Sequence, residues 1–428
     1  MLKQTKGGVK GTQNMTKTTP DRYTPCDMRF FIPGSHPSLS LAELAAVLGP
    51  TGPADYAQAA AEAFLIETTR DPEELQERLG GIVKTGTVVG ELARYNVQAA
   101  VDALWPLIQT AAENTEGKIS FGLSVYALEN KGMAAQIARD RQRIGLELKK
   151  RLKELGRPVR YVDSKERDLS AVIVIENGLL ETGGDWALIA GADRIFLGRT
   201  EAVQNYKEWG RRDYGRPAAD AKSGMLPPKL SRMMVNLAGV EPTGASLLDP
   251  FCGSGTVLME AGLLGFERLA GNDIEAKAVA DTKKNLVWSG QEAEIVQGDA
   301  SNIADRLPGP FDAVVTEPYL GPPRTKKPTA AEAGRTVAEL LRLYTRAFAS
   351  IRRLLRPGGA CVVSFPVFET VEHRLFMPLR PLFEETGFTV RPPLPDSAPP
   401  ALKERTPNGG LLYRRPDAIV SREIIILE

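Results

Sequence analysis

The feature that most constrains this chain is a short glycine-containing loop in its C-terminal half. The loop reads Asp249-Pro-Phe-Cys-Gly-Ser-Gly-Thr256 and directly follows the apolar run Leu247-Leu248. From Ser246 onward, strand-like and helix-like segments alternate, which is typical of an open, doubly wound parallel sheet. The sequence therefore predicts an α/β fold for the C-terminal half, with the loop between its first strand and first helix.

The remaining elements of this half follow from the same periodicity. The expected strands are 246–249, 269–273, 294–297, 311–316 and 360–365. The expected helices are 257–264, 276–288 and 331–355, with a short turn near Ile303. Segments 411–413 and 419–427 are expected to close the sheet as an antiparallel pair.

The loop chemistry favours a cationic ligand. Ligands of open α/β sheets bind at the carboxyl ends of the strands, where glycines let the backbone approach closely. The loop lacks the third glycine of a dinucleotide-binding motif and the lysine of a P-loop. An acid opens it instead, so we expect Asp249 to face the ammonium or sulfonium end of S-adenosylmethionine. The alternative is an ordinary glycine-rich turn.

Two further acids are expected at successive strand ends. Asn272-Asp273 ends the second strand, where a carboxylate can accept hydrogen bonds from both ribose hydroxyls. Gly298-Asp299-Ala300 ends the third strand, where an aspartate can accept from an adenine amino group. Either acid alone could be a surface loop residue, but three acids at successive strand ends favour one cofactor site.

The fourth strand ends in Glu317-Pro318-Tyr319. The lone pair of an aryl amine is delocalised into its ring, and acceptors for its N–H groups help to localise it. Glu317 and the Pro318 carbonyl could be those acceptors, and Tyr319 could stack on the base. Positioning would then supply most of the catalysis. The alternative is a proline-containing turn that only ends the strand.

Composition excludes several other chemistries. The chain has 428 residues, three cysteines and two histidines. Widely spaced cysteines, Cys26, Cys252 and Cys361, predict neither disulfides nor zinc and indicate a reducing compartment. The absence of a signal peptide or a long apolar run predicts a cytoplasmic protein without a membrane partner.

The N-terminal half is expected to be α+β. Strand-like segments are predicted to begin at Arg29 and to cover 119–128, 159–162, 171–175 and 187–197, with a strand pair near 80–89. A helix is expected over 133–155 and another over 41–48, where Ser40 and Glu43 suggest a capping box. A further helix is expected over 229–237, after a connector.

Two basic stretches stand out against a net charge of only +1. Residues 139–160 hold nine Lys or Arg against three acids, and clustered cations can bind a nucleic-acid backbone. A solvated helix is the alternative interpretation. The candidate RNA-binding residues are Arg139, Arg141, Arg143, Lys149, Lys150, Lys153, Arg157 and Arg160. The second stretch comprises Lys207, Arg211, Arg212, Arg216, Lys222, Lys229 and Arg232.

Together, these motifs resemble a known family. The C-terminal half looks like a class I S-adenosylmethionine-dependent amino-methyltransferase. The whole chain from about Arg29 resembles the tRNA guanosine N2-methyltransferases that carry a THUMP domain and modify guanosine at position 10. The supporting segments are 39–44, 79–84, 121–126, 197–200, 211–213, 225–230, 234–237 and the Asp249–Thr256 loop.

The resemblance implies a Rossmann-like methyltransferase sheet preceded by ferredoxin-like and THUMP modules. The implied divisions are a disordered basic tail (1–24), a ferredoxin-like domain (25–90), a THUMP domain (91–195), a linker (196–240) and the methyltransferase (241–428). The expected cofactor-binding residues are Asp249, Phe251, Cys252, Gly253, Ser254, Gly255, Thr256, Asn272, Asp273, Ile274, Asp299 and Ala300.

The sequence departs from the family at its catalytic motif, which is usually Asp or Asn-Pro-Pro-aromatic. Here Glu317 replaces the shorter residue, and Tyr319 stands one position earlier than the usual aromatic. The expected activity is methyl transfer to a guanosine N2 amine of tRNA. An rRNA or DNA amino-methyltransferase and an inactive RNA-binding relative are the alternatives. A monomer or dimer is expected, and a small partner protein is left open.

Overall fold

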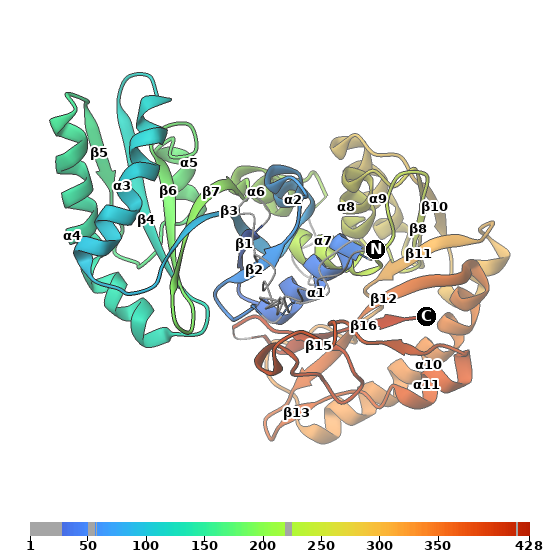
Figure 1. The fold of residues 1–428 in the computed structure, drawn as a ribbon. Helices are drawn as coiled ribbons and strands as arrows, with labels where there is room; N and C mark the ends of the chain where they lie inside the picture. The colour runs from blue at the N-terminus through green and yellow to red at the C-terminus, as the bar shows by residue number, and fades with distance from the viewer. Residues whose placement is uncertain (1–27, 50–55, 57, 219–224, 417) are drawn as a thin grey trace, which may run out of the picture.

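The computed structural model describes residues 28–49, 56, 58–218, 225–416 and 418–428. The predictions for the basic tail (1–24), Cys26 and Lys222 lie outside these residues. In Figure 1 the described chain forms an N-terminal lobe built around β4 and α4, a C-terminal lobe built around β8 and β12, and a junction between them that contains α1 and α7.

The N-terminal lobe contains a seven-stranded mixed sheet with the order β2-β1-β3-β7-β6-β4-β5. Strand β4 pairs parallel with β5 and β6, and the other pairs are antiparallel. Its strands are β1 (Met28–Pro33), β2 (Phe64–Glu67), β3 (Ile82–Leu92), β4 (Ile119–Ala127), β5 (Val159–Val162), β6 (Gly184–Ala190) and β7 (Ile195–Val203). This arrangement confirms the α+β expectation.

The helices of this lobe pack on the sheet through apolar faces. Buried Leu104 and Ile108 of α3, and Ile137 and Leu148 of α4, form one core with β4, β6 and β7. The helices are α1 (Pro37–Leu48), α2 (Pro72–Arg78), α3 (Val97–Glu113), α4 (Lys131–Glu154) and α5 (Ala171–Glu176).

The C-terminal lobe contains a nine-stranded sheet whose main path is β10-β9-β8-β11-β12-β16-β14. Strands β8 to β12 are parallel, and β16 returns antiparallel to β12. The strands are β8 (Ser246–Asp249), β9 (Arg268–Asp273), β10 (Glu294–Gln297), β11 (Phe311–Thr316), β12 (Leu355–Glu369), β13 (Arg374–Leu375), β14 (Val390–Arg391), β15 (Leu411–Tyr413) and β16 (Val420–Leu427). The predicted doubly wound sheet and its antiparallel closing pair are confirmed.

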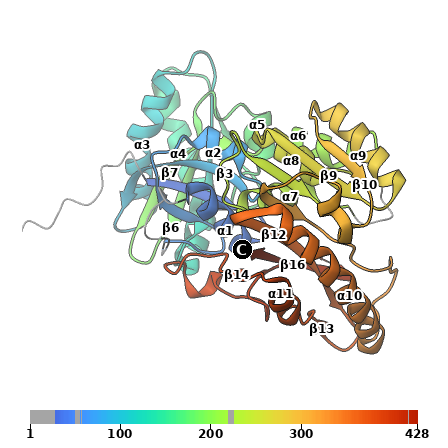
Figure 2. The same cartoon turned by 90° about the vertical axis from the view of Figure 1, so that its right-hand side faces the viewer.

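Helices cover both faces of this sheet (Figure 2). Alternate strand residues face opposite sides, so Leu247 of β8 packs with α7 and α8, whereas Leu248 packs with α10. The covering elements are α8 (Thr256–Leu264), α9 (Ala276–Ser289), η2 (Ala300–Asp305), α10 (Ala330–Leu354), α11 (Arg380–Thr386) and η3 (Pro400–Leu402). Strand order reverses between β8 and β11, and this switch point is where ligands of such sheets bind.

A connecting segment joins the two lobes through α6 (Tyr206–Tyr214) and α7 (Pro228–Leu237). Helix α7 packs against both α1 and α8. One hydrophobic core runs from Leu41 of α1 through Met234 of α7 to Leu258 of α8. The first helix and the C-terminal sheet therefore share a continuous apolar core.

The predicted strand at 171–175 is wrong, because these residues form helix α5. The Ser170 side chain accepts a hydrogen bond from the Ile173 amide and begins the helix. Ala171 and Val174 are buried on one side, whereas Val172 is exposed. Local capping and one-sided packing therefore override the strand preference of β-branched residues.

The predicted capping box is also wrong. Helix α1 begins at Pro37, so Ser40 and Glu43 are inside it. The Ser40 hydroxyl donates to the carbonyl oxygens of His36 and Gly81. Glu43 is completely buried and supports a contact between distant segments, which sequence spacing alone does not reveal.

A third correction concerns the glycines near 80–86, which suggested a turn between two strands. Residues 82–92 are instead one long strand, β3, in the middle of the sheet. A Cβ atom on Gly86 would lie 2.1 Å from the Arg199 carbonyl oxygen and 2.5 Å from the Phe30 ring. Gly86 therefore permits close packing within a strand.

The second basic stretch is largely internal. Arg212 and Arg232 both pair with the buried Glu260, at 2.8 Å and 2.7 Å. Arg216 is buried, and its Nη1 donates to the Thr256 hydroxyl. These cations join the connecting segment to α8, so they do not form an open phosphate-binding surface. Within the described ranges, none of the helices is both long and apolar enough to cross a membrane.

Glu43 is the polar link at the junction. Its carboxylate accepts from the amides of Gly80 and Gly81, at 2.7 Å and 2.8 Å, and from Asn236 Nδ2 at 2.7 Å. Burial raises the pKa of Glu43 to about 7, although these hydrogen bonds oppose the shift. The Asn236 amide also donates to the Arg78 carbonyl at 2.9 Å, so α1, α7 and the α2–β3 turn meet at one point.

We expect Glu43→Ala to lower the free energy of unfolding by about 3 kcal/mol or more, because three buried donors lose their acceptor. Thermal and urea unfolding measure this change. Glu77→Ala removes an exposed carboxylate nearby and is the control. Equal stability of the two variants would contradict the importance assigned to the link.

Candidate functional site

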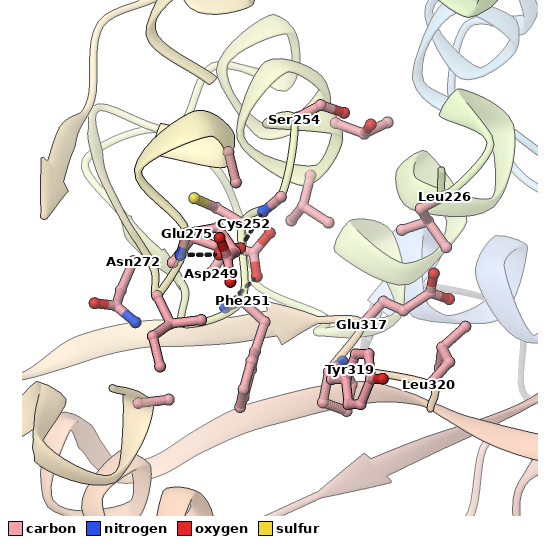
Figure 3. A pocket seen from close by; sticks show the side chains of 18 of the residues that line it. Leu226, Asp249, Phe251, Cys252, Ser254, Asn272, Glu275, Glu317, Tyr319 and Leu320 are labelled. Atoms are coloured by element: carbon pink, nitrogen blue, oxygen red, sulfur yellow. Dashed lines mark hydrogen bonds between the residues drawn. The ribbon is translucent and has the colours of Figure 1, made fainter. Parts of the chain in front are cut away.

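A cavity of about 790 Å³ lies at the switch point of the C-terminal sheet. Its walls come from the loops after β8, β9, β10 and β11, with Leu226 of the connecting segment and Leu343 of α10. In Figure 3, Asp249, Phe251 and Cys252 lie together on one side of the cavity, and Glu317 and Tyr319 lie on another. The topology therefore brings the separate sequence motifs to one place.

Asp249 ends β8 and is buried. Its Oδ1 accepts from the Thr316 hydroxyl at 2.7 Å and from the Phe251 amide at 3.2 Å. Burial raises the pKa of Asp249 to about 7, and the charges of Asp273 and Glu317 contribute to the rise, whereas the two hydrogen bonds oppose it. A cation in the cavity would favour the ionised carboxylate.

The glycine loop is held in shape by α9. Gly255 has a φ of 84°, and a Cβ there would lie 3.0 Å from Thr282. The Thr282 hydroxyl donates to the Gly253 carbonyl at 2.7 Å, and Asn285 Nδ2 donates to the Ser254 carbonyl at 2.8 Å. A Cβ on Gly253, by contrast, would meet only open space. The loop thus keeps its backbone open toward the cavity.

Two other predicted cofactor residues, Cys252 and Thr256, belong to this loop. Burial raises the pKa of the Cys252 thiol, which does not suit a nucleophile. Thr256 begins α8 and accepts from Arg216. Sequence reasoning placed Arg216 on a basic surface. The structure instead places Arg216 behind the glycine loop, where it contacts Thr256.

The end of β9 places Asp273 beside the loop and Asn272 beneath it. Asp273 Oδ2 accepts from the Gly253 amide, and Oδ1 accepts from the Glu275 amide, both at 2.9 Å. Asn272 is fully buried, and its Nδ2 donates to the carbonyls of Pro250 and Gly298. Asn272 therefore ties two cavity loops together, whereas Asp273 is partly exposed. Ile274 is 62% exposed at the rim.

Asp299 and Ala300 bring the end of β10 to the same cavity. Asp299 Oδ1 accepts from the Ser301 amide at 2.9 Å and so begins η2. This hydrogen bond lowers the pKa of Asp299 against the opposing effect of burial. An ionised acceptor is therefore maintained at this corner.

Glu317 follows β11 and lines the cavity. Its Oε1 accepts from Arg422 Nε at 2.6 Å and from the Ser364 hydroxyl at 2.8 Å, and its Oε2 accepts from Arg422 Nη2 at 3.0 Å. Pro318 is buried, whereas the Tyr319 side chain is 53% exposed. The Tyr344 hydroxyl donates to the Tyr319 carbonyl at 2.5 Å and holds the motif backbone.

Sequence reasoning missed Arg422 and Ser364. The available signal was the pair Arg422-Glu423 directly before the apolar run 424–427, because charged residues in a buried strand need partners. The partner of Arg422 is more than a hundred residues away in the sequence. Only the strand order could identify it.

The predicted RNA-binding residues divide into exposed and internal groups. Arg139, Arg143, Lys150 and Lys153 are exposed at spacings of four, seven and three along α4, which puts them on one side of the helix. Lys149 is half-buried, and Arg160 is exposed on the edge strand β5. These residues form a basic stripe on the N-terminal lobe.

Arg141 and Arg157 have internal partners instead. Arg141 is buried and donates to Asp163 Oδ1 and the Glu166 carbonyl, both at 2.6 Å. Arg157 Nη1 donates to the Ala112 carbonyl at the end of α3, at 3.0 Å. Their guanidinium groups stabilise the lobe and do not belong to the exposed stripe.

Comparisons with known proteins agree with this fold. The methyltransferase domain described as RMKL-like, UPF0020, matches residues 216–375. The tRNA (guanine(10)-N2)-dimethyltransferase of Methanothermobacter thermautotrophicus is 35% identical over 219 residues, which cover 49% of this chain and 61% of the relative. The match thus spans less than two thirds of that relative's length.

Two other similarities cover more of the matched protein. The probable tRNA (guanine(10)-N2)-dimethyltransferase of Methanothermococcus thermolithotrophicus is 31% identical, over 27% of this chain and 74% of the relative. The crystal structure of TrmN from Thermus thermophilus aligns over 94% of this chain and 99% of that chain, with a TM-score of 0.53. At 19% identity, the latter bears on the fold alone.

The matched sequence segments contain the cavity motifs, and the sheet has the order and switch point of a class I methyltransferase. The chain belongs to the tRNA (guanine-N2) methyltransferase family of class I methyltransferases.

Proposed function

We propose that this chain transfers a methyl group from S-adenosylmethionine to the N2 amine of a guanosine in tRNA. The observation that carries the proposal is the single cavity in which Asp249, Asp273 and Asp299 meet Glu317-Pro318-Tyr319. The names of the 35% and 31% identical relatives support guanosine N2 as the target and tRNA as the substrate.

The hydrogen-bond acceptors that line the cavity suit the proposed cofactor. Its acids can accept hydrogen bonds from an ammonium group, ribose hydroxyls and an adenine amine, which are all donors. The absence of a side chain at Gly253 leaves open space beside the loop backbone, which a Cβ atom would occupy. Among the described residues, the buried Asn272 Oδ1 also lacks a hydrogen-bond partner. When bound, S-adenosylmethionine supplies an electrophilic methyl group on a sulfonium centre.

The residues after β11 would act on the target base. Glu317 and the Pro318 carbonyl would accept hydrogen bonds from the amine and keep its lone pair available. The exposed Tyr319 ring offers a stacking surface for a base turned out of its helix. The chain's own contribution is therefore orientation and hydrogen bonding, without a covalent enzyme intermediate.

The N-terminal lobe would bind the folded RNA. We assign the THUMP-like module to residues 91–195, which contain β4 to β6 and helices α3 to α5. The exposed cations of α4 support backbone contacts, which depend on shape and phosphate positions more than on base sequence. The cytoplasmic location and the domain limits given above remain parts of this proposal.

Methyl transfer from labelled S-adenosylmethionine to unmodified tRNA, followed by nucleoside analysis, tests the function. We expect N2-methylguanosine from the wild type. Glu317→Ala should lower kcat about 100-fold and leave cofactor affinity nearly unchanged. Asp273→Ala should chiefly raise the KM for the cofactor. Bound cofactor without a methylated tRNA product would favour an rRNA or DNA substrate, or an inactive protein.

Cofactor affinity should depend on pH through Asp249. Its folded-state pKa of about 7 means that the carboxylate is largely protonated at pH 6 and largely ionised at pH 8. Because the cofactor's ammonium group favours the ionised form, affinity should rise roughly tenfold over this range. Calorimetry with S-adenosylhomocysteine measures the rise. Asp249→Asn should flatten the profile, and an equal pH slope in this variant would contradict the assignment.

The α4 stripe should contribute to tRNA affinity. We expect Arg143→Glu combined with Lys150→Glu to raise the Kd for tRNA at least tenfold and to reduce its salt dependence. Arg353→Glu with Arg380→Glu reverses two exposed cations of the C-terminal lobe and is the matched control. Filter binding at several salt concentrations gives both quantities. Unchanged affinity in the α4 variant would remove this surface from the proposal.

A further inference from the structure

The glutamate of the unusual Glu-Pro-Tyr motif is held by the last long strand of the sheet. Arg422 lies on β16, opposite Pro366 of β12, whereas Glu317 follows β11. Since β12 lies between β11 and β16, the guanidinium reaches across the end of a whole strand to meet the carboxylate. Ser364 of β12 completes the contact from that intervening strand.

The contact is two-pronged and nearly excluded from solvent. Arg422 Nε and Nη2 donate to different oxygens of Glu317, at 2.6 Å and 3.0 Å. The side chains of Arg422 and Glu317 are only 11% and 13% exposed. Burial alone would lower the pKa of Arg422, but the Glu317 carboxylate reverses this effect and raises it. Such a buried pair is costly to break because the remaining charge lacks compensation.

The pairing determines what Glu317 can offer a substrate. A carboxylate has about four acceptor positions. Hydrogen bonds from the described residues occupy two on Oε1 and one on Oε2, so one position on Oε2 remains. Glu317 lines the cavity, and this position is therefore available for one amine N–H.

A glutamate without such a clamp would sample many rotamers around its extra methylene group. We infer that Arg422 is the positioning residue that allows Glu317 to serve as amine acceptor in place of the shorter aspartate or asparagine. This inference rests on the proposed function. Arg422 acts on the carboxylate and not on the substrate, so its removal should affect kcat through Glu317.

The experiment compares Arg422→Met, Arg422→Lys and wild type in the tRNA methylation assay. Arg422→Met should lower kcat about 100-fold, as expected for a misplaced reacting group, while the affinity for S-adenosylhomocysteine stays within about twofold. Lysine retains the charge but lacks the planar fork, so Arg422→Lys should recover part of the activity. Arg380→Met, which removes an exposed arginine of α11, is the control.

A double-mutant cycle tests whether Arg422 acts through Glu317. In a Glu317→Gln background, Arg422→Met should cause little further loss of kcat, because the carboxylate that it positions is already absent. An equal loss in both backgrounds would overturn the inference. Wild-type kcat in a folded Arg422→Met variant would overturn it as well.

Two further measurements distinguish a positioning role of Arg422 from a loss of folding stability and from a wrong choice of substrate. If Arg422→Met does not fold, Ser364→Ala removes one hydrogen bond and should lower kcat by a factor of about three to ten at nearly unchanged Tm. Crystal structures of the wild type and Arg422→Lys report the Glu317 orientation without any activity. Failure of the wild type to methylate tRNA would reject the proposed substrate, whereas full kcat together with an unchanged Glu317 orientation in a crystal structure of Arg422→Met would reject the positioning role.

Discussion

The carboxyl ends of β8, β9 and β11 meet at one edge of the sheet, so the acids that follow them line one cavity. Each acid has different partners. Asp273 accepts hydrogen bonds from two backbone amides, and Asp249 accepts from a hydroxyl and an amide. Glu317 forms an ion pair with Arg422. Asp249 is buried and has no ion pair with another described residue, and burial raises its pKa to about 7. The site is consequently arranged for a ligand that brings positive charge.

A second constraint couples this site to the N-terminal lobe. Helix α7 lies within the single apolar core that joins α1 to α8, and its Asn236 donates to Glu43 of α1. Arg216, Arg232 and Asn285 add polar links between the connecting segment and the loop or helix after β8. A surface on the N-terminal lobe is therefore held at a defined position relative to the cavity, which the proposed binding of a folded RNA would require.

The sequence predicted the elements of the C-terminal sheet well because parallel strands and their helices have strong, different periodicities. The same reasoning failed at 171–175 and at Glu43. In the first case, a capping serine and one-sided burial overrode β-branched propensity. In the second, a spacing typical of a helix start belonged to a residue whose hydrogen-bond partners are distant in sequence. Short-range patterns carry no information about such partners.

The sequence by itself determined the chemistry available: acids at successive strand ends, a glycine loop open to a ligand, and a Glu-Pro-Tyr turn after the fourth strand. These are local properties, since each depends on residue type and position within one element. The tertiary structure alone decided which charges are paired. In the folded chain, Arg141 and Arg216 have internal partners and do not belong to the basic surfaces, and Arg422 pairs with Glu317. The reason is physical: ion pairing depends on distance and burial, and strand order brings together residues far apart in the chain.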